Sequence, residues 1–269
     1  MAVGQPVDML GIFKEGEFNM GNFANAIRGT YVPNGNVAVF WAGQAGFIIK
    51  TSKNKLIALD LYLSDCCERY FGFKRIMPYI LEAHELKFDM VLASHSHYDH
   101  FDVDSIPMLL NSNCKFVGAS DTKAECERLG IKDNLTFIKL GDNVEFDEIK
   151  IKGVMCDHGE LAPEALGLLI EIDGKKIYYA GDTAYRENIF SNPQIQNVDL
   201  LIVPINGMFG NLNSKEAAKA AQVVNPKLTV PCHFWNFAEH EGNPNEFIQN
   251  MKENNLNYNL LRIGEGIII

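Results

Sequence analysis

Residues 89–100 read DMVLASHSHYDH, in which six residues typical of a buried strand lead into the hexapeptide HSHYDH. The chain has seven histidines, and three of them fall in this hexapeptide beside an aspartate. Imidazoles and carboxylates are the usual ligands of borderline divalent cations. A strand that ends in a loop turns alternate side chains toward one point. A lone histidine is more often a surface or core residue, but a cluster this dense indicates a metal or catalytic site.

Short apolar runs on both sides of the hexapeptide predict a scaffold rich in β-strands. Residues 37–51 (VAVFWAGQAGFIIKT) and 55–61 (KLIALDL) are two such runs separated by the turn-like residues 52–54, which predicts a β-hairpin. A second hairpin is predicted over residues 166–182, with Asp173-Gly174 as its turn. Further strands are predicted at residues 114–119, 135–140, 148–155, 199–205 and 227–234.

Helical patterns lie between the later strands. They are predicted at residues 121–129, at residues 214–224 with Ser214 as the N-cap, and at residues 245–253. The strands first form a meander and then alternate with helices, in two similar halves. This order predicts an α/β fold in which two sheets pack face to face with helices outside, a four-layer αβ/βα sandwich.

The composition of the 269-residue chain is that of a globular protein, with 47% hydrophobic and 22% charged residues. That balance excludes disorder for most of the chain. No repeat and no linker rich in Pro, Gly or Ser interrupts it. We therefore expect one domain over residues 1–269, in which residues 1–35 form an N-terminal extension that packs over the body or covers a site.

Charge and cysteine usage restrict the partners and the compartment. The formal net charge of −10 argues against a general nucleic-acid-binding surface. No apolar run is long enough to cross a bilayer, and the first residues lack the features of a signal peptide. The six cysteines form no CxxC pattern. We expect a cytoplasmic protein with reduced thiols that acts on a small molecule, without nucleic-acid or membrane partners; a homo-oligomer stays open.

The spacing HxHxDH, with further single residues along the chain, resembles the signature of the metallo-β-lactamase superfamily of metal-dependent hydrolases. From about Asn36 onward, every further motif of that superfamily has a matching position in the same order. These positions are Asp60 in KLIALDL, His158 in VMCDHGE, Asp182 in YYAGDT and His233 in TVPCHF. The resemblance implies a four-layer sandwich of the metallo-β-lactamase type, with the active site at one edge where loops of both sheets meet.

The resemblance also implies two metal positions that share one carboxylate. The implied ligands are His95, His97 and His158 at the first position, Asp99, His100 and His233 at the second, and Asp182 as the bridge, with Asp60 orienting ligands. Two cations a few ångströms apart need such an anionic bridge. Ligands of nitrogen and oxygen suit two divalent ions per chain, Zn²⁺, Mn²⁺ or Fe²⁺. Cys232 adjoins His233 on a strand end and should point to the opposite face, into the core.

Within the superfamily, the sequence resembles the L-ascorbate-6-phosphate lactonase (UlaG-like) branch. Three stretches carry this resemblance: residues 59–78, 93–107 and 229–244. The implied function is the opening of a lactone, such as the sugar-phosphate lactone L-ascorbate 6-phosphate, by attack of a metal-bound hydroxide. Asp99 or Asp182 would orient this hydroxide or take its proton.

A phosphorylated lactone requires cationic contacts. Arg75 and Arg186 lie near motif residues in the sequence, and Trp235 and Asn236 directly follow the His233 motif. These four residues are the candidates for substrate contact. Ordinary surface charges and core aromatics are the more common explanation for each of them alone.

Two alternatives stay open. The same metal pair could act on a phosphodiester such as a cyclic nucleotide; a basic rim around the pocket would favour a phosphodiester, and a neutral rim an uncharged ester. A non-catalytic metal-binding protein would be favoured by the loss of a ligand, and no ligand is missing. The remaining histidines are His84, expected on a surface helix, and His240, expected in a loop with a chance of lining the pocket.

Overall fold

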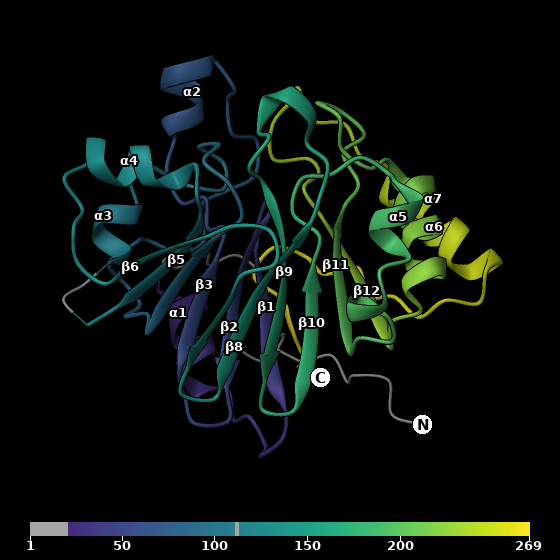
Figure 1. Ribbon diagram of the computed structural model, residues 1–269, viewed down its shortest axis with the longest axis horizontal. Helices are drawn as coiled ribbons and strands as arrows, with labels where there is room; N and C mark the ends of the chain where they lie inside the picture. Colours follow the sequence, from purple (N-terminus) through teal and green to yellow (C-terminus); the bar gives the residue numbers. More distant parts are fainter. Residues whose placement is uncertain (1–20, 111–112) are drawn as a thin grey trace.

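The computed structural model describes residues 21–110 and 113–269. Two β-sheets pack face to face, and helices cover the outer face of each sheet, so the layers run helix, sheet, sheet, helix (Figure 1). This architecture confirms the four-layer αβ/βα sandwich that the order of predicted strands and helices indicated.

The first sheet consists of β1 (Val37–Gly43), β2 (Gly46–Thr51), β3 (Leu56–Leu59), β4 (Met90–Ala93), β5 (Lys115–Ala119), β6 (Leu135–Ile138) and β13 (Gly266–Ile268). The strand order is β13-β1-β2-β3-β4-β5-β6, antiparallel from β13 to β3 and parallel from β3 to β6. Along β1 the side chains alternate: Val39 and Trp41 belong to the core between the sheets, whereas Ala38 and Phe40 face the helices. Burial on both faces explains why these strands read as continuous apolar runs.

The second sheet consists of β7 (Asn143–Phe146), β8 (Ile149–Met155), β9 (Leu166–Ile172), β10 (Lys175–Tyr179), β11 (Leu200–Pro204) and β12 (Leu228–Cys232). The strands β7 to β10 form an antiparallel meander, and β10 to β12 pair in parallel. The predicted hairpin over residues 166–182 is confirmed, because β9 pairs with β10. At its turn, Asp173 and Gly174 have φ values of 51° and 76°. A tight hairpin turn of type I′ requires positive φ at both positions.

The prediction of one continuous run over residues 37–51 is wrong, because the chain folds back on itself at Gln44. Gly43 and Gln44 adopt left-handed φ values of 97° and 50°, and β1 pairs antiparallel with β2. A Cβ on Gly46 would lie 3.1 Å from the carbonyl oxygen of Gly43, which favours glycine there. The predicted hairpin at residues 52–54 is confirmed, since β2 pairs antiparallel with β3. The additional turn places Gln44 at the end of the sheet where β3 and β4 finish.

Helices flank both sheets (Figure 1): α1 (Asn22–Gly29), α3 (Ile106–Leu109) and α4 (Thr122–Arg128) beside the first, and α5 (Glu187–Phe190), α6 (Ser214–Val224) and α7 (Pro244–Glu253) beside the second. Shorter elements are α2 (Cys66–Phe71), η2 (Gly159–Leu161) and η3 (Pro193–Ile195). The three predicted helices are confirmed as α4, α6 and α7. The N-cap of α6 is Asn213 rather than Ser214, because Asn213 and Glu216 form a reciprocal capping box. Within the described residues, no helix is both long and apolar enough to span a membrane.

The described part of the N-terminal extension packs against the body of the protein, and residues 1–20 lie outside the described residues. The sequence shows no clear periodicity here, yet α1 buries Phe23 and Ile27 on the helix side of the first sheet, with Phe23 edge-on to Phe40. The buried Lys50 ammonium donates to three carbonyl oxygens at the end of α1, including those of Ile27 and Thr30, at 2.8–2.9 Å. This cation satisfies carbonyl groups that a helix end leaves unpaired. Burial lowers the pKa of Lys50.

Candidate metal centre

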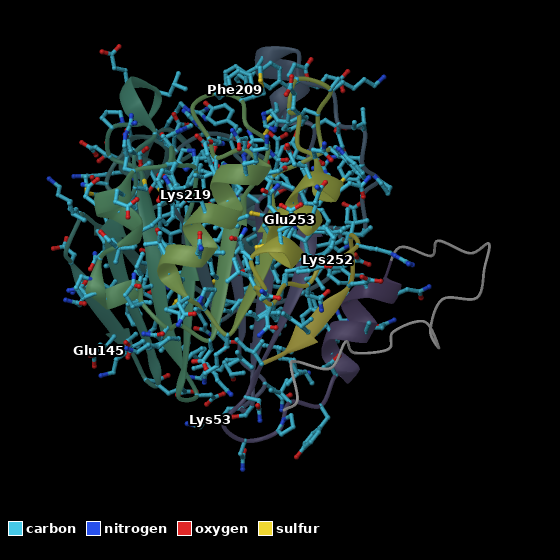
Figure 2. The ribbon with its side chains drawn as sticks, turned by 90° about the vertical axis from the view of Figure 1, so that its right-hand side faces the viewer. Lys53, Glu145, Phe209, Lys219, Lys252 and Glu253 are labelled. Atoms are coloured by element: carbon cyan, nitrogen blue, oxygen red, sulfur yellow. The ribbon has the colours of Figure 1, made fainter. Side chains whose placement is uncertain are left out.

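The predicted ligands meet at one end of the sandwich, where strands of both sheets finish. They are Asp60 after β3, residues 95–100 after β4, His158 after β8, Asp182 after β10 and His233 after β12. Figure 2 shows Phe209 among the loops at this end of the molecule, whereas Lys53 and Glu145 lie toward the opposite end. Five segments that are far apart in the sequence therefore contribute side chains to one site.

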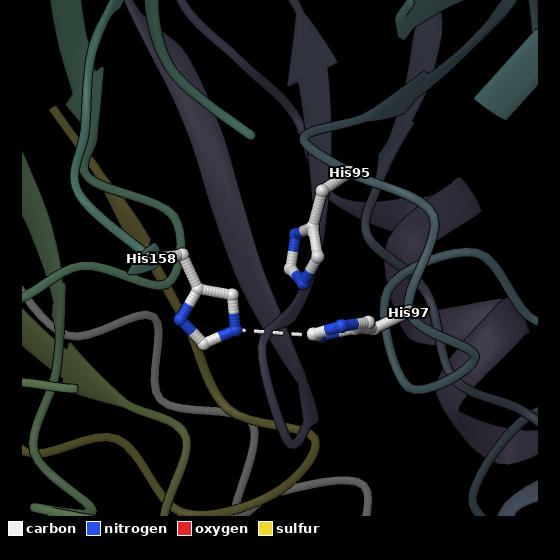
Figure 3. Close-up of side chains that lie close together, drawn as sticks. All are labelled: His95, His97 and His158. Carbon is white, nitrogen blue, oxygen red and sulfur yellow. Dashed lines mark hydrogen bonds between the residues drawn. The ribbon is translucent and has the colours of Figure 1, made fainter. Parts of the chain in front are cut away.

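Three histidines form the first cluster. His95, His97 and His158 each offer a ring nitrogen within 4.8 Å of the others. Figure 3 shows the three rings turned toward a common point, with His158 Nε2 3.3 Å from His97 Nδ1. His95 is completely buried, and its Nε2 has no hydrogen-bond partner among the described residues. A buried imidazole nitrogen without a partner is costly unless a cation or water meets it.

Two histidines and two aspartates form the second cluster. His233 Nε2 lies 3.1 Å from His100 Nε2, 3.2 Å from Asp182 Oδ1 and 3.3 Å from Asp99 Oδ2. His100 Nε2 lies 3.3 Å from Asp182 Oδ1 and 3.6 Å from Asp99 Oδ2. Ligand atoms at about 2.0–2.1 Å from a tetrahedral cation are about 3.3–3.4 Å apart. The distances from His233 Nε2 to the other three atoms are therefore those expected between ligands of one cation.

Asp182 reaches both clusters with different oxygens. Its Oδ1 faces His100 and His233, and its Oδ2 lies 3.7 Å from His158 Nε2. Oδ1 is buried and has no hydrogen-bond donor among the described residues. One carboxylate thus faces two groups of imidazoles, which is the arrangement that a bridge between two cations requires. The donor set of nitrogen and oxygen, with its unpartnered buried atoms, fits divalent cations.

Asp60 ties the second cluster to the sheet. It is completely buried, and its carboxylate accepts hydrogen bonds from the Ser94 backbone N–H and from Tyr179 OH, both at 2.8 Å, and from the Ser94 hydroxyl. His100 Nδ1 lies 2.7 Å from Asp60 Oδ2. Because an ionised carboxylate only accepts, His100 carries a proton on Nδ1 and turns Nε2 toward the cluster. Asp60 therefore orients a predicted ligand without belonging to the four-atom cluster.

Comparison with known proteins places this site in a family. A family described as "Beta-lactamase superfamily domain" matches residues 38–233. A UPF0173 metal-dependent hydrolase of Pelotomaculum thermopropionicum is 30% identical over 219 residues, which cover 78% of this chain and 89% of that protein. The chain belongs to the metallo-β-lactamase superfamily of metal-dependent hydrolases. Neither match singles out the UlaG-like branch, so that part of the resemblance stays a prediction.

Solved structures share the fold of this hydrolase at lower sequence identity. Igni18, a metallo hydrolase from Ignicoccus hospitalis, superimposes with a TM-score of 0.69 at 21% identity, covering 87% of this chain and 98% of that one. An isothiocyanate hydrolase from Delia radicum gut bacteria gives a TM-score of 0.68 at 18% identity, covering 85% and 97%. At sequence identities this low, the superpositions show that the fold is shared and nothing more.

The two clusters of the hydrolase differ in their electrostatics. Burial, with help from neighbouring imidazoles, lowers the pKa of both His95 and His158. Burial also opposes the charged forms of His100 and His233, but the adjacent carboxylates, Asp182 foremost, outweigh it. They raise the pKa of His100 well above its usual range and that of His233 to about 9. In the metal-free hydrolase, the second cluster therefore holds protons at neutral pH that His95 and His158 do not.

This difference predicts that metal binding at the second cluster releases protons. A histidine must lose its ligating proton to bind a cation, and His233 keeps its proton until the pH rises through about 9. The metal affinity of the second cluster should thus increase with pH up to about 9, while that of the first should change little above neutral pH. Calorimetric titration with Zn²⁺ in buffers of different ionisation enthalpy measures the protons released. Equal heats in all buffers for both binding events would contradict the prediction.

Two of the four predicted substrate contacts, Arg75 and Asn236, are buried behind the site. The Arg75 side chain is 5% exposed, and its guanidinium donates to the carbonyl oxygens of Tyr62 and Ser64 at 2.8 and 3.1 Å. It also lies 4.2 Å from the centre of the Tyr62 ring and donates to Asn236 Oδ1. Asn236 is completely buried. Neither residue lines the cavity over the metal clusters.

The other two candidates, Arg186 and Trp235, are exposed but also lie outside the cavity lining. Arg186 Nε donates to Asp157 Oδ2 at 2.6 Å, and its side chain is 58% exposed. The Trp235 ring donates to the carbonyl oxygen of Gly242 at 3.0 Å. Proximity to a motif in the sequence did not place these side chains on the cavity wall; after the His233 motif the chain bends, since His233 and Trp235 both have a left-handed φ of 59°.

Gln44 and His240 lie beside the second cluster and were not among the predicted contacts. Gln44 is buried in the β1–β2 turn and donates to Asp99 Oδ2 at 2.8 Å, and His240 lines the cavity beside His233. Gln44 stands between glycines in an apolar run, a weak signal for a turn, whereas His240 was assigned to a loop and does lie in one. Cys232 is buried in the core, as predicted, while His84 is exposed on a turn rather than a helix.

Proposed function

We propose that this hydrolase cleaves the ester bond of an uncharged small molecule, lactones included, that carries an apolar group. The observation that supports this proposal is the wall of the cavity that lies over the two clusters of candidate ligands. This cavity has a volume of about 460 Å³. That size is within the range of small-molecule sites. Apolar and aromatic side chains form much of the wall: Phe71, Phe73, Tyr98, Leu161 and Phe209.

The charge of the wall favours a neutral substrate over a phosphorylated one. Among the described residues that line the cavity, none is a lysine or arginine, and three are carboxylates: Asp99 and Asp182 of the two clusters, and Glu125 outside them. Arg75 and Arg186 are engaged elsewhere. A phosphate group placed against this wall would lose water without gaining a lysine or arginine partner, which costs free energy. The absence of a basic rim among these lining residues is also the feature that disfavours the phosphodiester alternative.

The residues around the cavity have distinct tasks in ester hydrolysis. Two divalent cations, when bound, would supply a Lewis acid for the carbonyl oxygen and lower the pKa of water. His95, His97 and His158 would hold one, and Asp99, His100 and His233 the other, with Asp182 between them. The carboxylate of Asp99 is partly exposed and lines the cavity, so it can take a proton from the attacking water and return it to the leaving oxygen.

A substrate panel tests this proposal with metal-loaded protein. It contains p-nitrophenyl butyrate, a γ-lactone with an alkyl tail, L-ascorbate 6-phosphate lactone, a cyclic nucleotide and an aryl isothiocyanate. The last is included because an isothiocyanate hydrolase shares the fold and its substrate class is also uncharged and apolar. We expect kcat/KM to be at least about tenfold higher for the neutral esters than for the phosphorylated compounds. A preference for the cyclic nucleotide would favour the phosphodiesterase alternative. If no compound is turned over, the alternative of a non-catalytic metal-binding protein is favoured.

The apolar wall itself is tested by Phe209→Ala. Phe209 is 41% exposed, and its ring packs 5.7 Å from Phe73 and 5.4 Å from His240, so truncation should remove apolar contact with the substrate while the fold stays intact. We expect KM for the alkyl lactone to rise about tenfold, consistent with the loss of one partly buried aromatic contact. The matched control is Trp235→Ala, which removes an exposed aromatic ring outside the lining. Equal kinetics in the two variants would show that the wall does not bind the apolar group.

A further inference from the structure

Gln44 is held next to the second cluster by a turn that disfavours most residues. It is completely buried, and its left-handed φ of 50° is unfavourable for a residue with a Cβ. Its backbone carbonyl oxygen accepts hydrogen bonds from the His233 backbone N–H and from Trp41 Nε1, both at 2.9 Å. Strained backbone conformations tend to persist where the surrounding structure uses them. This turn fixes both the main chain of His233 and the side chain of Gln44.

The side-chain amide of Gln44 lies among three possible acceptors. Its Nε2 is 2.8 Å from Asp99 Oδ2, 3.1 Å from His240 Nδ1 and 3.3 Å from His233 Nε2. An amide has two hydrogens to donate, and the carboxylate of Asp99 takes one of them. His233 Nε2 belongs to the four-atom cluster and would be engaged by a cation. The second hydrogen is therefore donated to His240 Nδ1.

This hydrogen bond fixes the tautomer of His240. A neutral imidazole that accepts at Nδ1 carries its proton on Nε2. The His240 ring stacks on His233 with centroids 4.7 Å apart and packs edge-on against Phe73 and Phe237. These contacts restrict its orientation, and the ring lines the cavity. Within the described residues, Nε2 of His240 makes no hydrogen bond, so its N–H is left for a ligand.

We propose that Gln44 and His240 form a donor pair beside the second metal position. Gln44 is the positioning residue: it orients the Asp99 carboxylate and fixes the tautomer of His240. His240 is a further catalytic residue, whose Nε2–H donates to an oxygen of the substrate in the cavity. The part that concerns the substrate rests on the proposed ester hydrolysis, whereas the tautomer and the support of Asp99 do not.

The tautomer is tested by NMR on zinc-loaded protein with ¹⁵N-labelled histidine. Long-range ¹H–¹⁵N spectra distinguish a protonated Nε2 from a protonated Nδ1, and His240→Gln assigns the signal by its loss. We expect His240 to carry its proton on Nε2, and Gln44→Ala to convert this signal to a mixture of tautomers. A proton on Nδ1 in the wild-type protein, or an unchanged signal in Gln44→Ala, would overturn the proposal whatever the substrate is.

Metal titration separates positioning from ligation. Because groups that orient ligands typically change metal affinity 10- to 100-fold, Gln44→Ala should weaken the second Zn²⁺ binding event about tenfold or more and leave the first unchanged. A ring nitrogen of His240 lies within 4.8 Å of ligand atoms of Asp99 and His233, but its Nδ1 is paired with Gln44, so on this proposal His240→Phe should leave both events unchanged. The controls are Gln249→Ala on the exposed face of α7 and His84→Phe on its exposed turn. Loss of a metal in His240→Phe would identify His240 as a ligand instead and overturn its role as donor.

Kinetics complete the test with whichever ester the protein turns over. His240→Phe should lower kcat about 100-fold at full metal occupancy, the usual effect of removing one donor to a developing oxyanion. His240→Gln, whose amide can still donate, should recover part of this loss, which a merely structural role would not explain. Equal losses in both variants would contradict the donor role. If no ester is turned over, the proposed function fails, and the NMR and metal titration still decide the tautomer and the role of Gln44.

Discussion

Replacing Asp182 by asparagine is expected to lower kcat/KM by about a thousandfold or more and to reduce the bound metal from two equivalents toward one. The two carboxylate oxygens face different clusters: Oδ1 lies near His100 and His233, and Oδ2 lies near His158. D182N keeps the volume of the side chain but removes the negative charge that offsets the repulsion between two cations. It also leaves the imidazoles of His100 and His233 without their strongest electrostatic partner. Metal analysis of the purified variant, paired with its activity, measures both effects.

The control for D182N is Asp147→Asn, which removes a largely exposed carboxylate paired with Lys55 at the surface. That variant should bind and hydrolyse like the wild type. Circular dichroism and thermal unfolding establish that D182N is folded, so that a loss of activity can be assigned to the site. Two tightly bound metals and near wild-type activity in D182N would show that Asp182 does not bridge, and the binuclear hypothesis would fail.

The candidate metal site at residues 95–100 and the fold could be predicted from the sequence, because both depend on local patterns. His95, His97 and His100 share a short segment after an apolar strand, and their clustering alone indicates a metal site. The alternation of strands and helices likewise indicates layered sheets. His158 and Asp182 carry no comparable local signal: each became a candidate only through its place in a series of motifs, and the structure brings both to within 3.7 Å of one another.

Residues that a turn or a loop brings to the site from elsewhere in the chain could not be predicted in this way. Gln44 lies at the site because the chain reverses direction between β1 and β2. His240 lies there because its loop packs its ring against His233. Arg75 was predicted to contact substrate from its position near a motif. Its guanidinium instead satisfies buried carbonyl oxygens and stacks on an aromatic ring, a role that depends on contacts distant in the sequence. Sequence order fixes which residues are near a motif, whereas side-chain direction decides which of them face the cavity.

Replacing Asp60 by alanine is expected to destabilise the metal-free protein by about 3–5 kcal/mol. Removal of the carboxylate leaves the Ser94 backbone N–H, the Tyr179 hydroxyl and His100 Nδ1–H buried without their acceptor. Each lost partner of a buried donor costs about 1–3 kcal/mol, and breaking a buried charged network costs about 3–5 kcal/mol. The backbone of Asp60 adds to this sensitivity, since its left-handed φ of 45° is adopted more readily by aspartate than by alanine. Denaturant unfolding followed by tryptophan fluorescence measures the free energy of unfolding.

The matched control is Asp89→Ala, at the opposite end of β4. Its carboxylate accepts one backbone hydrogen bond, from Leu56 at 2.8 Å, and its loss should cost about 1 kcal/mol. A second variant, D60N, tests whether Asp60 also orients His100 for metal binding. D60N keeps an acceptor oxygen and should fold, but it no longer offers His100 a negatively charged partner. We therefore expect D60N to bind the second Zn²⁺ about tenfold or more weakly, with the first unaffected. If Asp60→Ala costs no more stability than Asp89→Ala, the buried network does not support the fold, and if D60N binds both metals normally, Asp60 does not orient His100.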